Sequence, residues 1–152
     1  MIIAVDFDGT IVEHEYPKMG KEIPFAIDSL KKLQEEDQHM LILWTVRDGE
    51  LLEEAVQFCE KRGLKFYAVN KNYPEEDSST ASRKINADLY LDDRGLGGLP
   101  DWGMIYKMIK SGPKFTFNYN ILCHYEMEVK KSDRKNFFTK LGEVMDKGRS
   151  KR

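Results

Sequence analysis

Long hydrophobic runs are missing from this chain of 152 residues. The longest, Met1–Val5 and Met40–Trp44, are far shorter than the roughly 18 apolar residues that a membrane-crossing helix needs. The amino terminus also lacks the basic region and the apolar stretch of an export signal. We therefore expect a cytoplasmic protein without a membrane partner.

Cysteine is scarce as well. The two cysteines, Cys59 and Cys123, lie far apart and at no metal-ligand spacing, which argues against a disulfide scaffold and a zinc ribbon. The chain does have a hydrophobic content of 41%, which fills one core of ordinary size at this length. We expect a core domain over residues 1–113 and an extension over residues 114–152.

Acidic residues are scarce only at the carboxyl end of the chain. Residues 130–152 carry nine Lys/Arg against three acids, a net +6, so residues 1–129 carry −8 of the overall −2. The basic tail is either a partner-binding segment or an ordinary solvated terminus. The acidic remainder would repel phosphate backbones, so nucleic acid is a disfavoured partner that the tail still leaves open.

Two kinds of apolar pattern alternate along residues 1–113. Short buried runs rich in β-branched residues predict strands at 1–5, 40–44, 66–69 and 87–91. Apolar residues at helical spacing predict helices at 23–33, 52–59, weakly at 81–85, and at 102–109 behind Asp101. The alternation predicts an α/β fold, in a three-layer Rossmann-like arrangement whose mostly parallel sheet has helices on both faces.

The extension has a different pattern. From Phe115 to Val129 every odd position is apolar or aromatic, the period of a half-buried strand. One such strand would span about 50 Å, so it must bend, form a hairpin or leave its own subunit. A helical pattern follows Ser132. We expect this strand and helix to pack on the core or on a second copy, as the contact of a homodimer.

Polar residues follow three of the predicted strands: Asp6 and Asp8, Thr45 and Arg47, and Asp92 and Asp93. Since the carboxyl ends of parallel strands share one edge, we expect these residues to converge. Crowded carboxylates repel one another unless a cation lies among them, and oxygen ligands without His or Cys favour Mg²⁺. The alternative is an ordinary turn at Asp8-Gly9-Thr10 and an ordinary loop start at Asp92-Asp93. We favour a magnesium site whose candidate ligands are Asp6, Asp8, Asp92 and Asp93.

Such a site suits phosphoryl chemistry. A carboxylate beside the cation can attack phosphorus and form an aspartyl-phosphate, which divides one difficult hydrolysis into two easier steps. A second acid must protonate the leaving oxygen and then deprotonate water. Asp6 and Asp8, separated by a single residue, can supply these two roles.

These residues carry a resemblance to the haloacid dehalogenase (HAD) superfamily of phosphotransferases. Asp6–Thr10 resembles its first motif, Leu41–Thr45 its second, and Leu91–Asp93 its acidic fourth motif. Lys84 is the candidate for its third-motif lysine, with Arg83 and Lys71 as alternatives. The likeness covers about residues 1–110 in the expected order. Because nothing of domain size fits between these motifs, the chain resembles the small capless members.

The resemblance implies a role for each residue. Asp6 is the nucleophile and Asp8 the general acid/base, which is the phosphatase pattern. The metal ligands are the Asp6 carboxylate, the Asp8 backbone carbonyl, and Asp92 or Asp93. Thr45 and Lys84 hold the phosphoryl oxygens. From its position, Arg47 either forks onto a substrate phosphate or is an exposed residue before a helix.

Two further residues border this set. His14 lies near the mouth of the expected site, where we expect solvent exposure, and Arg94 pairs with either Asp93 or a substrate. The expected activity is Mg²⁺-dependent hydrolysis of a phosphorylated small molecule. The alternatives are a phosphatase acting on 3′ nucleic-acid ends, and a non-catalytic phosphate-binding or receiver-like signalling domain.

Overall fold

A computed structural model describes residues 1–77, 79 and 83–112 of the chain. The chain divides into two units, Met1–Gly112 and Pro113–Arg152. The strand, helix and homodimer contact expected for residues 114–152 therefore lie outside the described residues. Within the described ranges, none of the helices combines the length and apolarity needed to cross a membrane.

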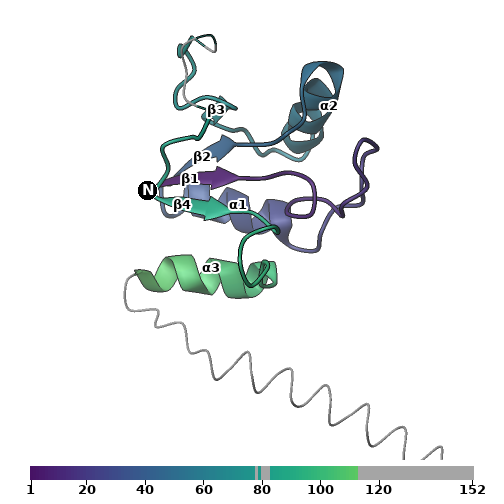
Figure 1. Cartoon of the computed structure of the whole chain (residues 1–152). Coiled ribbons are helices and arrows are strands. Elements are labelled where there is room, and N and C mark those ends of the chain that lie inside the picture. Colours follow the sequence, from purple (N-terminus) through teal and green to yellow (C-terminus); the bar gives the residue numbers. More distant parts are fainter. Residues whose placement is uncertain (78, 80–82, 113–152) are drawn as a thin grey trace, which may run out of the picture. The chain divides into compact units, whose positions relative to one another are not determined.

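Four parallel strands form the centre of the α/β fold (Figure 1). They are β1 (Ile2–Val5), β2 (Met40–Leu43), β3 (Ala68–Val69) and β4 (Leu89–Leu91), in the order β3-β2-β1-β4. In the register of the sheet, Val5 is level with Leu43 on β2 and with Leu91 on β4. The carboxyl ends of these three strands therefore lie at the same edge, as the sequence predicts.

Within the described residues, three helices accompany the sheet: α1 (Ala26–Glu35), α2 (Gly49–Glu60) and α3 (Trp102–Ser111). The α2 helix ends at Glu60, and Gly63 follows in the next turn with a φ of +81°, where the Leu64 N–H donates to the Cys59 carbonyl. The α3 helix begins behind Asp101, whose side chain accepts a hydrogen bond from the Met104 N–H. Both ends follow from local side-chain and backbone chemistry.

The weak helix predicted at 81–85 is wrong for the residues described there, 83–85, which are bent or extended. Downstream backbone groups bond to side chains instead of to one another. The Asn86 N–H donates to Asn72 Oδ1 at 2.6 Å, and the Ile85 carbonyl accepts the Tyr90 hydroxyl. Side-chain partners thus replace the helical ladder in this segment.

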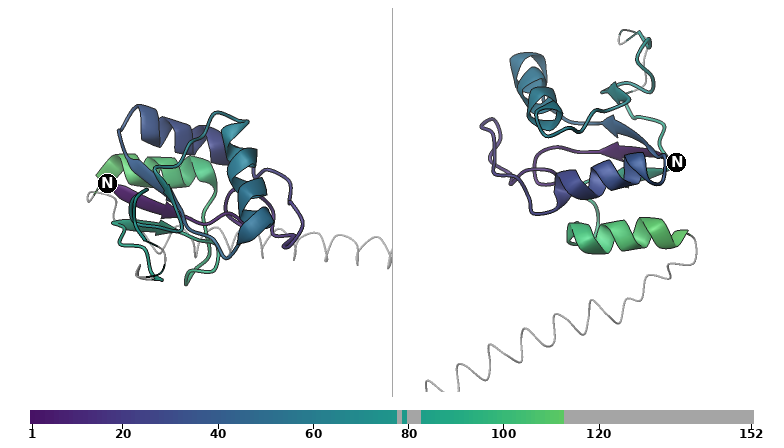
Figure 2. Two further views of the ribbon diagram at one scale, coloured as in Figure 1. Left: turned by 90° about the horizontal axis from the view of Figure 1, so that it is seen from above. Right: turned by 180° about the vertical axis from the view of Figure 1, so that it is seen from behind.

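The two faces of the sheet are covered differently. Alternate strand residues such as Val5 and Leu43 pack with buried side chains of all three helices. The intervening residues Ala4 and Ile42 pack with Ala68 and Ile85, in a cluster that contains no helical residue among those described. In Figure 2, α1 and α3 lie next to each other. Helices on both faces are therefore not confirmed by the described part of the chain.

Candidate metal and phosphoryl site

The candidate site lies where the strand order changes direction. From β1 the chain proceeds to β2 and β3 on one side, then returns to β4 on the other side of β1. Backbone hydrogen bonds hold this edge: the Asp6 N–H donates to the Leu91 carbonyl at 2.9 Å, and the Trp44 N–H donates to the Val5 carbonyl at 2.8 Å. Ligands of open parallel sheets bind at such a switch point. Asp6 and Asp92 follow the two strands that flank it.

Three carboxylates converge at this point. One ligand oxygen each from Asp6, Asp92 and Asp93 can be chosen so that all lie within 4.8 Å of one another. Burial raises the pKa of Asp6 to about 6; a backbone hydrogen bond at Phe7 opposes the rise, and the charges of Asp92, Asp8 and Asp93 add to it. Buried Asp93 Oδ1 has no hydrogen-bond partner among the described residues. These oxygens fit a hard divalent cation, which would relieve both the repulsion and the missing partner.

The turn after Asp8 is shaped to receive Asp93. Gly9 has a φ of +84°, and a Cβ atom built there would stand 2.3 Å from Asp93 Oδ2. The Asp93 N–H donates to Thr10 Oγ1 at 3.2 Å, and the Trp102 indole N–H donates to the Thr10 carbonyl at 2.9 Å. The sequence analysis missed these roles of Thr10 and Trp102. A small hydroxyl residue after the acidic turn was the available signal for Thr10, whereas Trp102 looked like an ordinary core residue.

Asp8 and Arg47 form a buried ion pair. Arg47 Nε and Nη2 donate to the two Asp8 carboxylate oxygens at 2.7 Å each, and the residues are only 3% (Asp8) and 1% (Arg47) exposed. Arg47 also donates to the backbone carbonyls of Pro17 and Lys18, at 3.3 and 2.8 Å. Its guanidinium carbon lies 5.1 Å from the centre of the Phe7 ring. Arg47 is therefore neither exposed nor presented to a substrate in this arrangement.

Asn70 fixes the loop that carries Thr45. The Thr45 N–H donates to Asn70 Oδ1 at 2.9 Å, and Thr45 Oγ1 accepts the Arg47 N–H at 3.3 Å. Asn70 itself has a φ of +51° at the end of β3, a conformation that Asn tolerates better than most residues. The end of β3 thereby holds the Thr45 hydroxyl beside the carboxylates.

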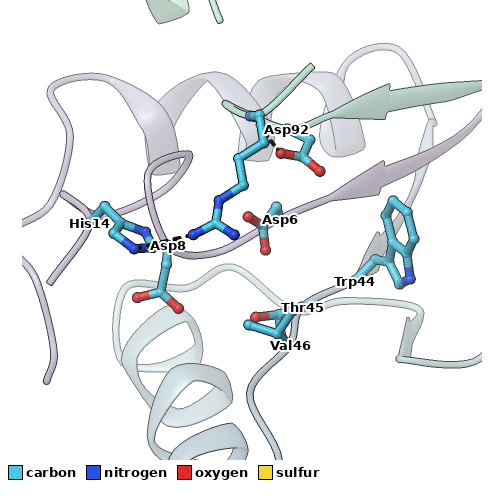
Figure 3. Close-up of a pocket in the computed structure, with 8 residues that line it drawn as sticks. Asp6, Asp8, His14, Trp44, Thr45, Val46 and Asp92 are labelled. Carbon is cyan, nitrogen blue, oxygen red and sulfur yellow. Dashed lines mark hydrogen bonds between the residues drawn. The ribbon is translucent and has the colours of Figure 1, made fainter. Parts of the chain in front are cut away.

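A depression of about 190 Å³ contains most of these groups (Figure 3). Four of its lining residues are predicted site residues, namely Asp6, Asp8, Thr45 and Asp92. The other four come from positions within or near the motifs and are His14, Trp44, Val46 and Arg94. Figure 3 shows His14 and Trp44 on opposite sides of Asp6, and the Asp8 carboxylate directed away from Asp92. The depression is therefore acidic in the middle, with different chemistry on its two sides.

Lys84 is not brought to this depression. It is exposed, and its Nζ lies 5.1 Å from the centre of the Tyr90 ring. Lys84 is also absent from the residues that line the depression. Contact between Lys84 and a phosphoryl group on Asp6 thus requires a change in the segment before β4.

Comparison with known proteins identifies a relative of this chain. No protein-family model and no curated protein matches the sequence. A solved structure, described as the conserved protein coded by locus from Bacteroides thetaiotaomicron, is 60% identical. The match covers 78% of this chain and 97% of that one, with a TM-score of 0.72. The chain belongs to the family of that conserved protein.

That description of the relative names no activity, so the chemistry of the family rests on the residues themselves. Three carboxylates and an adjacent hydroxyl can bind a divalent cation and an oxyanion together. Asp6 can act as a nucleophile there because one carboxylate oxygen can bind a cation while the other remains free. The depression is small beside the 300–1,000 Å³ of common ligand pockets, so it suits a small substrate or part of a larger one.

Proposed function

We propose that this protein is a Mg²⁺-dependent phosphatase of the HAD type, which hydrolyses a phosphate monoester through an aspartyl-phosphate on Asp6. The observation that carries the proposal is the convergence of Asp6, Asp92 and Asp93 within 4.8 Å at the switch point of the sheet. The strand order β3-β2-β1-β4 also equals the order of the first four strands of a Rossmann sheet. It supports the proposal of a three-layer Rossmann-like fold.

In the first step, an Asp6 carboxylate oxygen attacks phosphorus, the bond from phosphorus to the ester oxygen breaks, and the alcohol leaves with a proton. In the second step, water attacks the same phosphorus, and the bond to Asp6 breaks to give inorganic phosphate. Asp6, Asp92 and Asp93 would hold a Mg²⁺ ion, which would offset the negative charge of the phosphoryl group. The Thr45 hydroxyl donates to a phosphoryl oxygen.

Asp8 is proposed to give the proton in the first step and accept one in the second. Both of its oxygens accept hydrogen bonds from Arg47 in the described arrangement. Asp8 must therefore turn from Arg47 toward the depression, which it already lines, before it can act. The pair with Arg47 represents a resting arrangement of the acid/base.

The topology disfavours a receiver-like signalling domain. In receiver domains, which have the strand order 2-1-3-4-5, the first strand lies between the second and the third. Here β1 lies between β2 and β4, and β3 pairs with β2 alone. Phosphatase activity on 3′ nucleic-acid ends stays a prediction, because it depends on the basic tail, which lies outside the described residues. Activity on a 3′-phosphorylated oligonucleotide that is lost at raised salt would support it.

The deciding experiment is a screen of phosphate esters in Mg²⁺ and in EDTA, with Asp6→Asn and Asp28→Asn as matched variants. Asp28 is an exposed acid on α1, so its variant controls for the loss of one charge. We expect turnover only with metal, a loss of at least about a thousandfold in Asp6→Asn because the nucleophile is gone, and no loss in Asp28→Asn. Acid-quenched wild-type protein should carry one phosphoryl group on Asp6 by mass spectrometry. Full turnover by Asp6→Asn would exclude this mechanism.

A further inference from the structure

The cationic side of the depression is formed by Arg94 and His14. An Arg94 Nη2 lies 3.3 Å from His14 Nε2. Because a guanidinium has no acceptor, Arg94 donates and His14 accepts at Nε2, which places the proton of the neutral ring on Nδ1. This is the only side-chain hydrogen bond of that guanidinium within the described residues. Most of its five N–H donors thus remain available to a ligand.

Arg94 is the only lysine or arginine that lines the depression in the described part of the chain. Arg47 is committed to Asp8, and Lys84 lies over Tyr90. The backbone of Arg94 is fixed beside the metal ligands, since its N–H donates to Asp92 Oδ1 at 2.8 Å. The turn therefore holds this cation at a set place relative to the carboxylates.

The guanidinium of Arg94 is held on the His14 side of the depression, since its Nη2 lies 3.3 Å from His14 Nε2. His14 in turn lies on the side of Asp6 opposite Trp44 (Figure 3). The opposite side of the depression is apolar, with Trp44 and with Val46 76% exposed. A ligand that spans the depression thus meets carboxylates in the middle, a guanidinium on one side and apolar surface on the other.

We propose that Arg94, supported by His14, binds a second anionic group of the substrate. The substrate class is then a phosphorylated compound that also carries a carboxylate or a second phosphate. A guanidinium recognises either oxyanion through two parallel hydrogen bonds. Trp44 and Val46 are left to contact the carbon skeleton. This inference rests on the proposed phosphatase function, because Asp6 must receive the first phosphoryl group.

The test compares ligands that differ only in the second anion. Propylphosphonate and 3-phosphonopropionate are titrated calorimetrically into the full-length protein in Mg²⁺, with propane-1,3-bisphosphonate as the arm that separates phosphate from carboxylate. We expect at least one of the two ligands that carry a second anionic group to bind at least about tenfold more tightly than propylphosphonate. This ratio corresponds to about 1.4 kcal/mol, near the lower limit for a hydrogen bond to a charged group. Arg94→Ala should abolish this preference and leave binding of propylphosphonate within about threefold. Lys107→Ala on α3, exposed and not among the lining residues, is the charge-matched control and should keep the preference.

Three results would overturn the subsite: no preference in the wild type, a preference that survives Arg94→Ala, or an equal loss of all ligands in Arg94→Ala. The last result would show that Arg94 contacts the first phosphoryl group or supports the fold. Circular dichroism of Arg94→Ala shows whether the fold is lost, and Arg94→Lys is a second variant that keeps the charge. Together they separate these two causes. The proposed function fails by a different result, full turnover in Asp6→Asn, and the binding titrations remain interpretable in that case.

Discussion

The buried pair of Asp8 and Arg47 allows a quantitative prediction about stability. Replacing Arg47 with Met keeps much of the side-chain volume and removes the charge. The Asp8 carboxylate, 3% exposed, then loses both of its 2.7 Å hydrogen bonds. The carbonyls of Pro17 and Lys18 also lose a donor. An uncompensated charge in such a place is strongly unfavourable.

Removing one partner of a buried pair costs about 3–5 kcal/mol, which is a large part of the 5–15 kcal/mol that stabilises a typical domain. The chain contains a natural comparison for this magnitude. Arg62 and Glu22 pair at 2.6 Å, almost the same distance, but both side chains are 37% exposed. Solvent screening limits such a pair to about 0–1 kcal/mol. Glu22→Gln should therefore cost less than about 1 kcal/mol.

Urea unfolding at pH 7 measures both costs, and a double-mutant cycle isolates the pair. Asp8→Leu combined with Arg47→Met removes both charges, so the double variant should be much more stable than the sum of the two single losses predicts. Two results would refute the reasoning: equal costs for the buried and exposed pairs, or strictly additive losses in the cycle. Either would mean that water reaches Asp8 in solution.

Two further predictions concern the carboxylate cluster. Because the pKa of Asp6 is raised from 3.8 to about 6, its protonated carboxyl contributes stability that is fully present below pH 3.8 and is lost as the pH rises through 6. In EDTA at pH 7.5, Asp6→Asn should therefore unfold at a higher urea concentration than the wild type, with a free energy of unfolding about 1–3 kcal/mol larger. The same variant should show no gain near pH 4. Gly9→Ala should destabilise the fold by about 2 kcal/mol or more and weaken Mg²⁺ binding, since the new Cβ meets Asp93. Gly97→Ala also has a positive φ but open space, so it should cost about 1 kcal/mol and leave the metal titration unchanged.

Much of the fold could be predicted because buried strands and helix ends are local signals. The apolar run at 40–44 and the helix start behind Asp101 each correspond to an observed feature within a residue or two. The helix at 81–85 could not be excluded from spacing, because the partners that displace it, Asn72 and Tyr90, come from other segments. Non-local hydrogen bonds of this kind leave little trace in a single sequence.

The candidate site was predictable at the level of strand ends. Asp6 and Asp92 meet because parallel register places their strands level, and that geometry follows from the apolar pattern. Lys84 shows the limit of this reasoning, since it lies on a long connection whose path no periodicity defines. Residues that directly follow short strands are placed by the sheet, and residues within long loops are not.

Val46 and Arg47 show how a departure from hydropathy can mark a functional place. Hydropathy predicts a buried valine and an exposed arginine, yet Val46 is 76% exposed and Arg47 is 1% exposed. Arg47 can be buried because Asp8 and two backbone carbonyls satisfy its guanidinium. Burial of Val46 would have been favourable by itself, so its position at the depression has no explanation in core packing. Local violations of sequence rules concentrate where a site competes with stability. Arg47 binds the candidate acid/base Asp8, and Val46 belongs to the proposed contact with the substrate skeleton.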